Sequence, residues 1–99
     1  LVLRALEIRP DDGYFLDSFA WVHFRRGEYR RAEEELRRAL KLIPDDPVIL
    51  EHLGDVLQAQ GRDEEAAAGF EKAIAKGHEK PDDVGAKLHR LRKAQPAGK

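Results

Sequence analysis

Four histidines are the first residues in this chain that could bind a metal ion. His23, His52, His78 and His89 each offer imidazole nitrogens. A zinc site draws closely spaced donors from at least one element, yet no histidine here stands three or four residues from another. We therefore predict no metal site, and we expect His23 to pack between helices.

The charged run from Arg30 to Arg38 could supply paired carboxylates for acid–base chemistry or an arginine patch for phosphate. Its spacing favours another role, because each arginine stands four residues from a glutamate. On a helix such partners share a face and stabilise each other by roughly 0.2 to 0.5 kcal/mol per pair. The predicted pairs are Arg30 with Glu34, Arg31 with Glu35, Glu33 with Arg37, and Glu34 with Arg38. We interpret the run as a solvated helix face.

No catalytic residue is predicted. Gly27, Gly54, Gly61 and Gly69 stand singly instead of forming a phosphate-binding loop, and no nucleophile–base set is present. The absence of cysteine removes thiolate chemistry, disulfides and cysteine-based zinc sites. It leaves the compartment undecided between cytoplasm and periplasm. We predict a protein that is not an enzyme and needs no cofactor.

The composition is that of a soluble globular chain with no net electrostatic field. Ninety-nine residues suit one small domain, with 41% hydrophobic and 37% charged residues. Eighteen basic and nineteen acidic residues leave a formal charge of -1, which argues against nucleic-acid binding. No apolar stretch approaches the roughly 20 residues that span a bilayer. The chain lacks methionine and opens at Leu1 within an apolar pattern, so we expect a fragment of a longer protein.

The elements that position these side chains follow a repeat. Shifting the chain by 34 residues sets small residues on small ones and large residues on large ones, which is typical of stacked units. Apolar residues within each unit recur at helical spacing, so each unit should be two helices. The matches are Ala5, Ala39 and Ala73; Leu6, Leu40 and Ile74; Pro10 and Pro44; Leu16 and Leu50; Phe19 and Leu53; Ala20 and Gly54; Gly27 and Gly61; Ala32 and Ala66; Leu36 and Phe70.

Turn and cap residues divide the chain. Gly27 and Gly61 stand between the two helices of their units, where a short turn needs positive φ. Asp46 before Pro47 predicts an N-cap, and Asp63 is a second cap candidate. We predict a single domain over residues 1–94, made of the end of a preceding repeat (1–12), two repeats (13–46 and 47–80) and a capping helix (81–94), followed by a flexible tail (95–99).

The predicted capping helix has an apolar side and a basic side. Val84, Leu88 and Leu91 recur at helical spacing and should cover the preceding unit. Its outer side is predicted to carry Lys87, His89, Arg90, Arg92 and Lys93, which would keep the end of a stack soluble.

On these residues the chain resembles the tetratricopeptide repeat family, whose 34-residue unit runs large-x-x-Leu-Gly-x-x-large, then Ala-x-x-x-Phe, Ala and Pro. The second unit matches through Leu50, Leu53, Gly54, Leu57, Ala66, Phe70 and Ala73. The first matches through Leu16, Phe19, Ala20, His23, Ala32, Leu36, Ala39 and Pro44. The resemblance implies an all-α fold of antiparallel helix-turn-helix repeats, stacked as a right-handed α-solenoid. It also implies a protein–protein interaction scaffold, and the composition is similar to bacterial members.

The first helix of the first full unit is apolar nearly all round, so two of its faces need partners. In proteins similar to this family the second face lines a concave groove that holds peptides. The residues that this resemblance implies for binding are Tyr14, Asp17, Trp21, Phe24 and Arg25, continued on the next unit by Glu51, Asp55 and Gln58. The acidic continuation favours an apolar and basic partner segment. Packing of the aromatic residues against an upstream repeat remains an alternative.

A structural role is the second hypothesis. Fewer than about three repeats are marginal alone. The apolar residues Leu1, Leu3, Leu6 and Ile8 would form an uncovered helix end, through which the chain could form a homo-oligomer.

Overall fold

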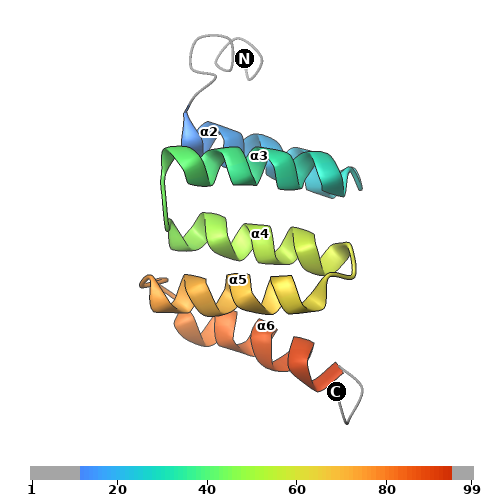
Figure 1. Cartoon of the computed structure of the whole chain (residues 1–99), viewed down its shortest axis with the longest axis vertical. Helices are drawn as coiled ribbons and strands as arrows, with labels where there is room; N and C mark the ends of the chain where they lie inside the picture. Colours follow the sequence, from blue (N-terminus) through green and yellow to red (C-terminus); the bar gives the residue numbers. More distant parts are fainter. Residues whose placement is uncertain (1–11, 95–99) are drawn as a thin grey trace.

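In the computed structural model of the protein, residues 12–94 are described and form five helices. These are α2 (Gly13–Arg25), α3 (Tyr29–Leu42), α4 (Pro47–Ala59), α5 (Asp63–Ala75) and α6 (Pro81–Ala94). Each helix runs antiparallel to the one before it, and the helices succeed one another along the long axis of the molecule (Figure 1). The predicted all-α class is confirmed. The predictions for residues 1–11 and 95–99, the self-association residues Leu1, Leu3, Leu6 and Ile8 among them, lie outside the described residues.

Glycine turns close the helix hairpins. Gly27 joins α2 to α3 at φ +79°, and Gly61 joins α4 to α5 at φ +77°. Glycine adopts this left-handed backbone without the steric cost of a Cβ atom. Beyond the first turn, the amide of Glu28 donates to the carbonyl of His23 at 2.9 Å, which satisfies an end of α2. The turn residues predicted from the repeat are thus confirmed.

One predicted helix cap is right and the other is wrong. Asp46 caps α4, and its Oδ1 accepts hydrogen bonds from the amides of Val48 at 3.0 Å and Ile49 at 3.1 Å. The N-cap position of α5 belongs to Arg62, whose side chain makes no cap hydrogen bond, and Asp63 is the first helical residue. Asp63 instead adds negative charge to the first turn, where it complements the helix dipole.

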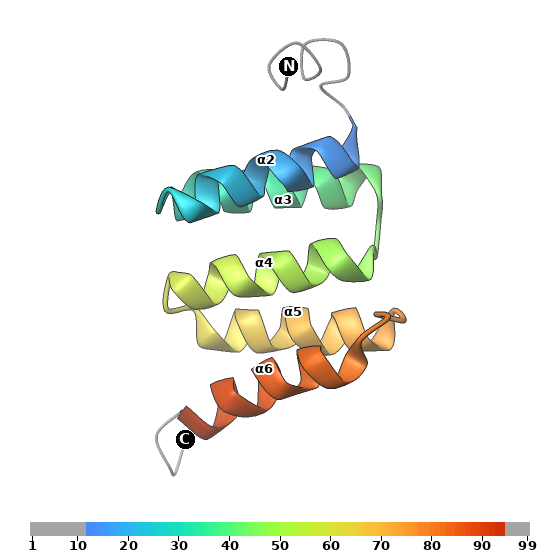
Figure 2. The same cartoon turned by 180° about the vertical axis from the view of Figure 1, so that it is seen from behind.

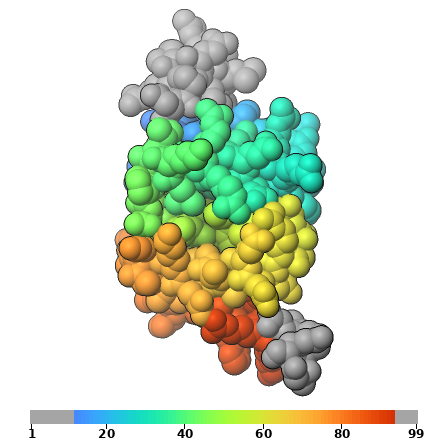
Figure 3. Space-filling view, viewed as in Figure 1, coloured from blue at the N-terminus to red at the C-terminus, as the bar shows by residue number. Residues whose placement is uncertain are grey.

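Small residues allow the helices to approach closely. A Cβ atom added to Gly54 on α4 would lie 2.6 Å from Cε1 of Phe70 on α5, so the ring occupies the space that a side chain would need. Phe70 is fully buried, as are four alanines of the second helices: Ala32, Ala39, Ala66 and Ala73. Side chains fill the space between the ribbons of neighbouring helices (Figure 3). The small positions of the repeat therefore set the helix crossings.

The charged run on α3 pairs differently from its prediction. Of the four predicted pairs, only Glu33 and Arg37 form an ion pair within the described residues, at 2.9 Å. Glu33 also accepts hydrogen bonds from the next repeat, at 2.7 Å from Arg62 and 3.0 Å from Gln60. Burial of Glu33 opposes its ionisation, but these donors and Arg37 outweigh that effect and lower its pKa. Charge on this helix therefore links two repeats.

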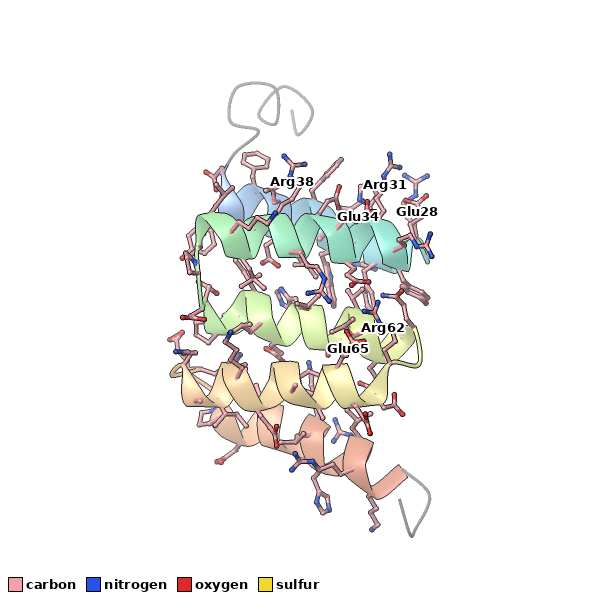
Figure 4. The ribbon with its side chains drawn as sticks, in the orientation of Figure 1. Glu28, Arg31, Glu34, Arg38, Arg62 and Glu65 are labelled. Atoms are coloured by element: carbon pink, nitrogen blue, oxygen red, sulfur yellow. The ribbon has the colours of Figure 1, made fainter. Side chains whose placement is uncertain are left out.

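The remaining glutamates and arginines of the run point in different directions from the helix, some into the core and some into solvent. Glu35 turns inward, where its carboxylate lies 2.6 Å from Nδ1 of the buried His23. His23 thus packs between helices, as predicted. Arg31 and Arg38 point away from α4, on the side of α3 that no later repeat covers (Figure 4). The run is a solvated face only in part.

The first helices of the hairpins gather on one face. Seen from the side opposite to Figure 1, α2 lies in front of α3, and α6 lies in front of α5 (Figure 2). Side chains of α2, α4 and α6 contact one another here, and these contacts build the candidate site.

Candidate functional site

Three aromatic rings form a wall that extends from α2 to α4. Trp21 and Phe24, three residues apart on α2, stack with their centroids 4.9 Å apart and an angle of 24° between the rings. His52 of α4 also lies beside Trp21, at 5.3 Å between centroids. Trp21 is 39% exposed, whereas Phe24 is half-buried against the core. We call Trp21, Phe24 and His52 the aromatic surface.

An aspartate on α2 holds the histidine of this surface in place. Nδ1 of His52 lies 2.7 Å from Oδ1 of Asp17. A carboxylate can only accept a hydrogen bond, so the proton belongs on Nδ1. Burial of His52 opposes its protonation, but Asp17, with Asp55 and Glu51 beyond it, outweighs burial and raises its pKa. The ring is therefore oriented by Asp17 and is protonated more readily than a free histidine.

A shallow pocket opens beside the aromatic surface. It has a volume of about 270 Å³ and is lined by Asp17, Ser18, Trp21 and His52. The residues of its walls therefore carry an indole ring, an imidazole, a hydroxyl group and a carboxylate. Such a mixture of apolar walls and a few convergent polar groups suits the side chain of a bound partner.

The acidic residues of α4 are occupied by groups from the end of the chain. Nζ of Lys87, on α6, lies 2.6 Å from Glu51 and 3.0 Å from Asp55. Nε2 of His78 lies 2.7 Å from the other oxygen of Glu51. Lys87 also lies 5.9 Å from the centroid of the Phe70 ring. Lys87 was predicted on the outer side of α6, and that placement is wrong.

Burial and pairing act differently on the two carboxylates of α4. Burial of Glu51 favours its neutral form, but the hydrogen bonds from Lys87 and His78 outweigh burial and lower its pKa. Burial dominates at Asp55 and raises its pKa despite the bond to Lys87. Neither side chain is an open acidic patch, since Glu51 is 15% exposed and Asp55 is 17% exposed. Lys87 and His78 therefore already pair with the carboxylates that were predicted to face a basic partner, and binding of such a partner here stays a prediction.

The other predicted site residues lie apart from these clusters. Tyr14 is 60% exposed and donates from its hydroxyl group to Oδ2 of Asp46 at 3.1 Å. The side chains of Arg25 and Gln58 are exposed and form no hydrogen bond or ion pair with any residue that the structure describes. The structure thus brings together Asp17, Trp21 and Phe24 with His52, which was missing from the predicted site.

Metal binding and membrane insertion find no support in the described part of the chain. No group of three or more histidine, aspartate or glutamate side chains within residues 12–94 could hold a metal ion. No helix in that range is long and apolar enough to cross a membrane.

Comparison with known proteins identifies the family. Residues 18–84 match the model of the tetratricopeptide repeat, which is more than half of the chain. The chain therefore belongs to the tetratricopeptide repeat family. A TPR repeat-containing protein of Pseudomonas aeruginosa is 44% identical over 55 residues, which cover 56% of this chain and 9% of the relative. The chain thus spans a small part of that relative's length.

Membership of the family bears on function at a general level. Tetratricopeptide repeats generally mediate protein–protein interactions and are typically not enzymes. The resemblance found in the sequence is confirmed, and the similar protein is bacterial, as the composition indicated.

Proposed function

We propose that this chain is a scaffold that binds a peptide or protein segment on the aromatic surface. The observation that carries the proposal is the wall of Trp21, Phe24 and His52, in which Trp21 is exposed beside a pocket, in a member of a protein-binding family. Aromatic side chains suit this role because they bury a large area and have few rotatable bonds to immobilise. Asp17 supports the surface by orienting His52.

The other predicted contacts take different places in this proposal. Tyr14, Arg25 and Gln58 are exposed and would border the bound segment. Glu51 and Asp55 would shape the surface through Lys87, because that lysine already occupies their carboxylates. The partner's main contacts would therefore lie on α2 and at the start of α4.

A peptide selection with a matched pair of variants tests the proposal. Peptides from a phage-displayed library, selected on the wild-type chain, are measured by fluorescence anisotropy against Trp21→Ala and Val22→Ala. Val22 is 48% exposed and neighbours Trp21 in sequence, but it lies outside the aromatic surface. We expect Trp21→Ala to weaken binding by roughly tenfold or more and Val22→Ala by less than about threefold.

Thermal melts followed by circular dichroism show whether both variants fold. Equal affinities of the wild-type chain and folded Trp21→Ala for every selected peptide would remove the aromatic surface from the function.

A structural role in self-association is the second candidate. Val22 and Leu42, the latter 46% exposed, are large apolar side chains that no described element covers. Such side chains favour contact with another repeat or a second copy. Sedimentation of the wild-type chain and Val22→Lys across micromolar to millimolar concentrations tests this candidate. A strict monomer throughout that range would contradict it.

A further inference from the structure

We propose that the pocket beside Trp21 accepts an arginine side chain of the bound partner. The inference rests on the proposed function and specifies its chemistry: the partner segment would place a guanidinium group against the indole ring and the Asp17 carboxylate. The pocket is lined by both of these groups, together with Ser18 and His52.

The Asp17 carboxylate has an oxygen available to a partner. Oδ1 is bound to Nδ1 of His52 at 2.7 Å, whereas Oδ2 makes no hydrogen bond to any described residue. The side chain is 14% exposed, so a cation that reaches it would be largely shielded from water. Charged hydrogen bonds are stronger than neutral ones in such surroundings. This oxygen is the acceptor that the proposal assigns to the arginine.

The indole ring supplies the second contact. Trp21 is 39% exposed; it stacks with Phe24 at 4.9 Å between centroids and has the His52 ring 5.3 Å away. Tryptophan is the aromatic side chain that attracts cations most strongly. A planar guanidinium group can lie against the ring and still donate an N–H group to Oδ2, which a lysine ammonium group does less well. Arginine therefore fits the pocket better than lysine.

The chain contains its own example of such a contact one repeat further along. Asp17 and Trp21 correspond to Glu51 and Asp55 at the 34-residue offset. At Glu51 and Asp55 a cation is present: Lys87 bonds to both carboxylates and lies 5.9 Å from the centroid of the Phe70 ring. The cation there comes from the chain itself.

Among residues 12–94, no lysine or arginine forms an ion pair with Asp17. The position equivalent to Lys87 is Leu53, which is apolar and only 6% exposed. The only positive charge that meets Asp17 among the described residues is on His52, when that ring is protonated. In the proposal, an arginine of the partner supplies the cation beside Asp17 and Trp21.

Titration with small probes tests the pocket directly. Trp21 is the only tryptophan in the chain, so its indole N–H signal in an NMR spectrum reports on this pocket alone. We expect N-acetyl-arginine methylamide to shift that signal and to bind about tenfold more tightly than the citrulline analogue, which has the same shape without the charge. The lysine analogue should fall between them.

A pair of charge-removing variants separates the pocket from general electrostatics. Asp17→Asn should reduce arginine binding about tenfold. Glu34→Gln, which removes an exposed carboxylate of α3, should leave it unchanged. Equal binding of the arginine and citrulline probes would overturn the inference, and that comparison needs no variant to fold.

The selected peptides distinguish failure of this inference from failure of the proposed function. Replacing each arginine of a Trp21-dependent peptide by citrulline should weaken its binding about tenfold at one position. If Trp21→Ala abolishes binding while every citrulline peptide binds as before, the arginine assignment is wrong and the proposed function stands. If Trp21→Ala has no effect, both are wrong.

Discussion

Two clusters on the face of α2, α4 and α6 occupy equivalent places in successive repeats yet have different neighbours. The first cluster comprises Asp17, Trp21 and His52, and the second comprises Glu51, Asp55, His78 and Lys87. In the second cluster, Lys87 of α6 bonds to the carboxylates of α4. In the first cluster, the equivalent position on α4 is the apolar Leu53. The two clusters thus differ at one position of the repeat, where Lys87 supplies a cation to the second cluster and Leu53 supplies none to the first.

The largest expected effect comes from a change that disturbs both clusters together. Gly54→Ala places a Cβ atom 2.6 Å from the buried Phe70 ring, so the ring or α4 must move. Because α4 contributes side chains to both clusters, we expect each to be disturbed. The free energy of unfolding should fall by about 1 to 3 kcal/mol in urea titrations followed by circular dichroism.

The matched control is Gly85→Ala on α6. A Cβ atom there would meet nothing within 4 Å, so this variant should gain about 0.5 to 1 kcal/mol from the better helix propensity of alanine. Equal stability of the two variants would mean that the contact with Phe70 does not limit the packing of α4.

A smaller loss of stability is expected from a change that disturbs only the second cluster. Lys87→Met removes the cation and leaves Glu51 and Asp55 half-buried without it. We expect a loss of about 1 to 2 kcal/mol of stability, because a poorly solvated carboxylate loses its partner. Lys93→Met, on the exposed side of the same helix, should change stability by less than about 0.5 kcal/mol.

The first cluster should be unaffected by Lys87→Met. Its indole N–H signal should keep the wild-type shift in NMR spectra of that variant. A large displacement of that signal would show that the two clusters act as one.

The smallest expected effect is a pH dependence that belongs to the first cluster. Asp17 raises the pKa of His52 against the opposing effect of burial, so the folded state binds the proton more tightly. The stability gained is fully present below the unfolded pKa of about 6.5 and is lost as pH rises through the higher folded value. We expect the advantage of wild type over His52→Gln to shrink by under about 1 kcal/mol across that range, since the pair is partly solvated.

Chemical denaturation of both chains at several pH values measures that difference. A stability difference that stays constant from acidic to alkaline pH would mean that protonation of His52 is not coupled to folding.

Periodicity made the scaffold predictable from the sequence. Gly27, Gly61 and the buried alanines stand at fixed places in the unit, and their roles depend on backbone geometry that every repeat shares. Glu35 was also within reach of prediction, because it lies three residues after Ala32 and four before Ala39, on the buried side of α3. Its place in the charged run from Arg30 to Arg38 instead favoured the prediction of a solvated side chain.

The clusters were less predictable because they depend on which long side chains meet across helices. Lys87 could extend to solvent or back toward α4, and helical spacing alone does not choose between these. His52 follows Asp17 by 35 residues, one repeat plus one position, which places both on neighbouring first helices. That spacing was the available signal. It predicts the contact between Asp17 and His52 only once α2 and α4 are known to be neighbours.

The carboxylate of Asp46 serves two repeats at once. Its Oδ1 caps the first turn of α4, while its Oδ2 accepts the hydroxyl group of Tyr14 from α2. In a linear array of repeats, contacts between neighbours determine whether units unfold singly or as a block. Opening of α2 therefore removes a hydrogen bond from Asp46, the residue that caps α4. Amide hydrogens at the start of α4 should consequently exchange together with those of the first hairpin, which extends the cooperative unit beyond a single repeat.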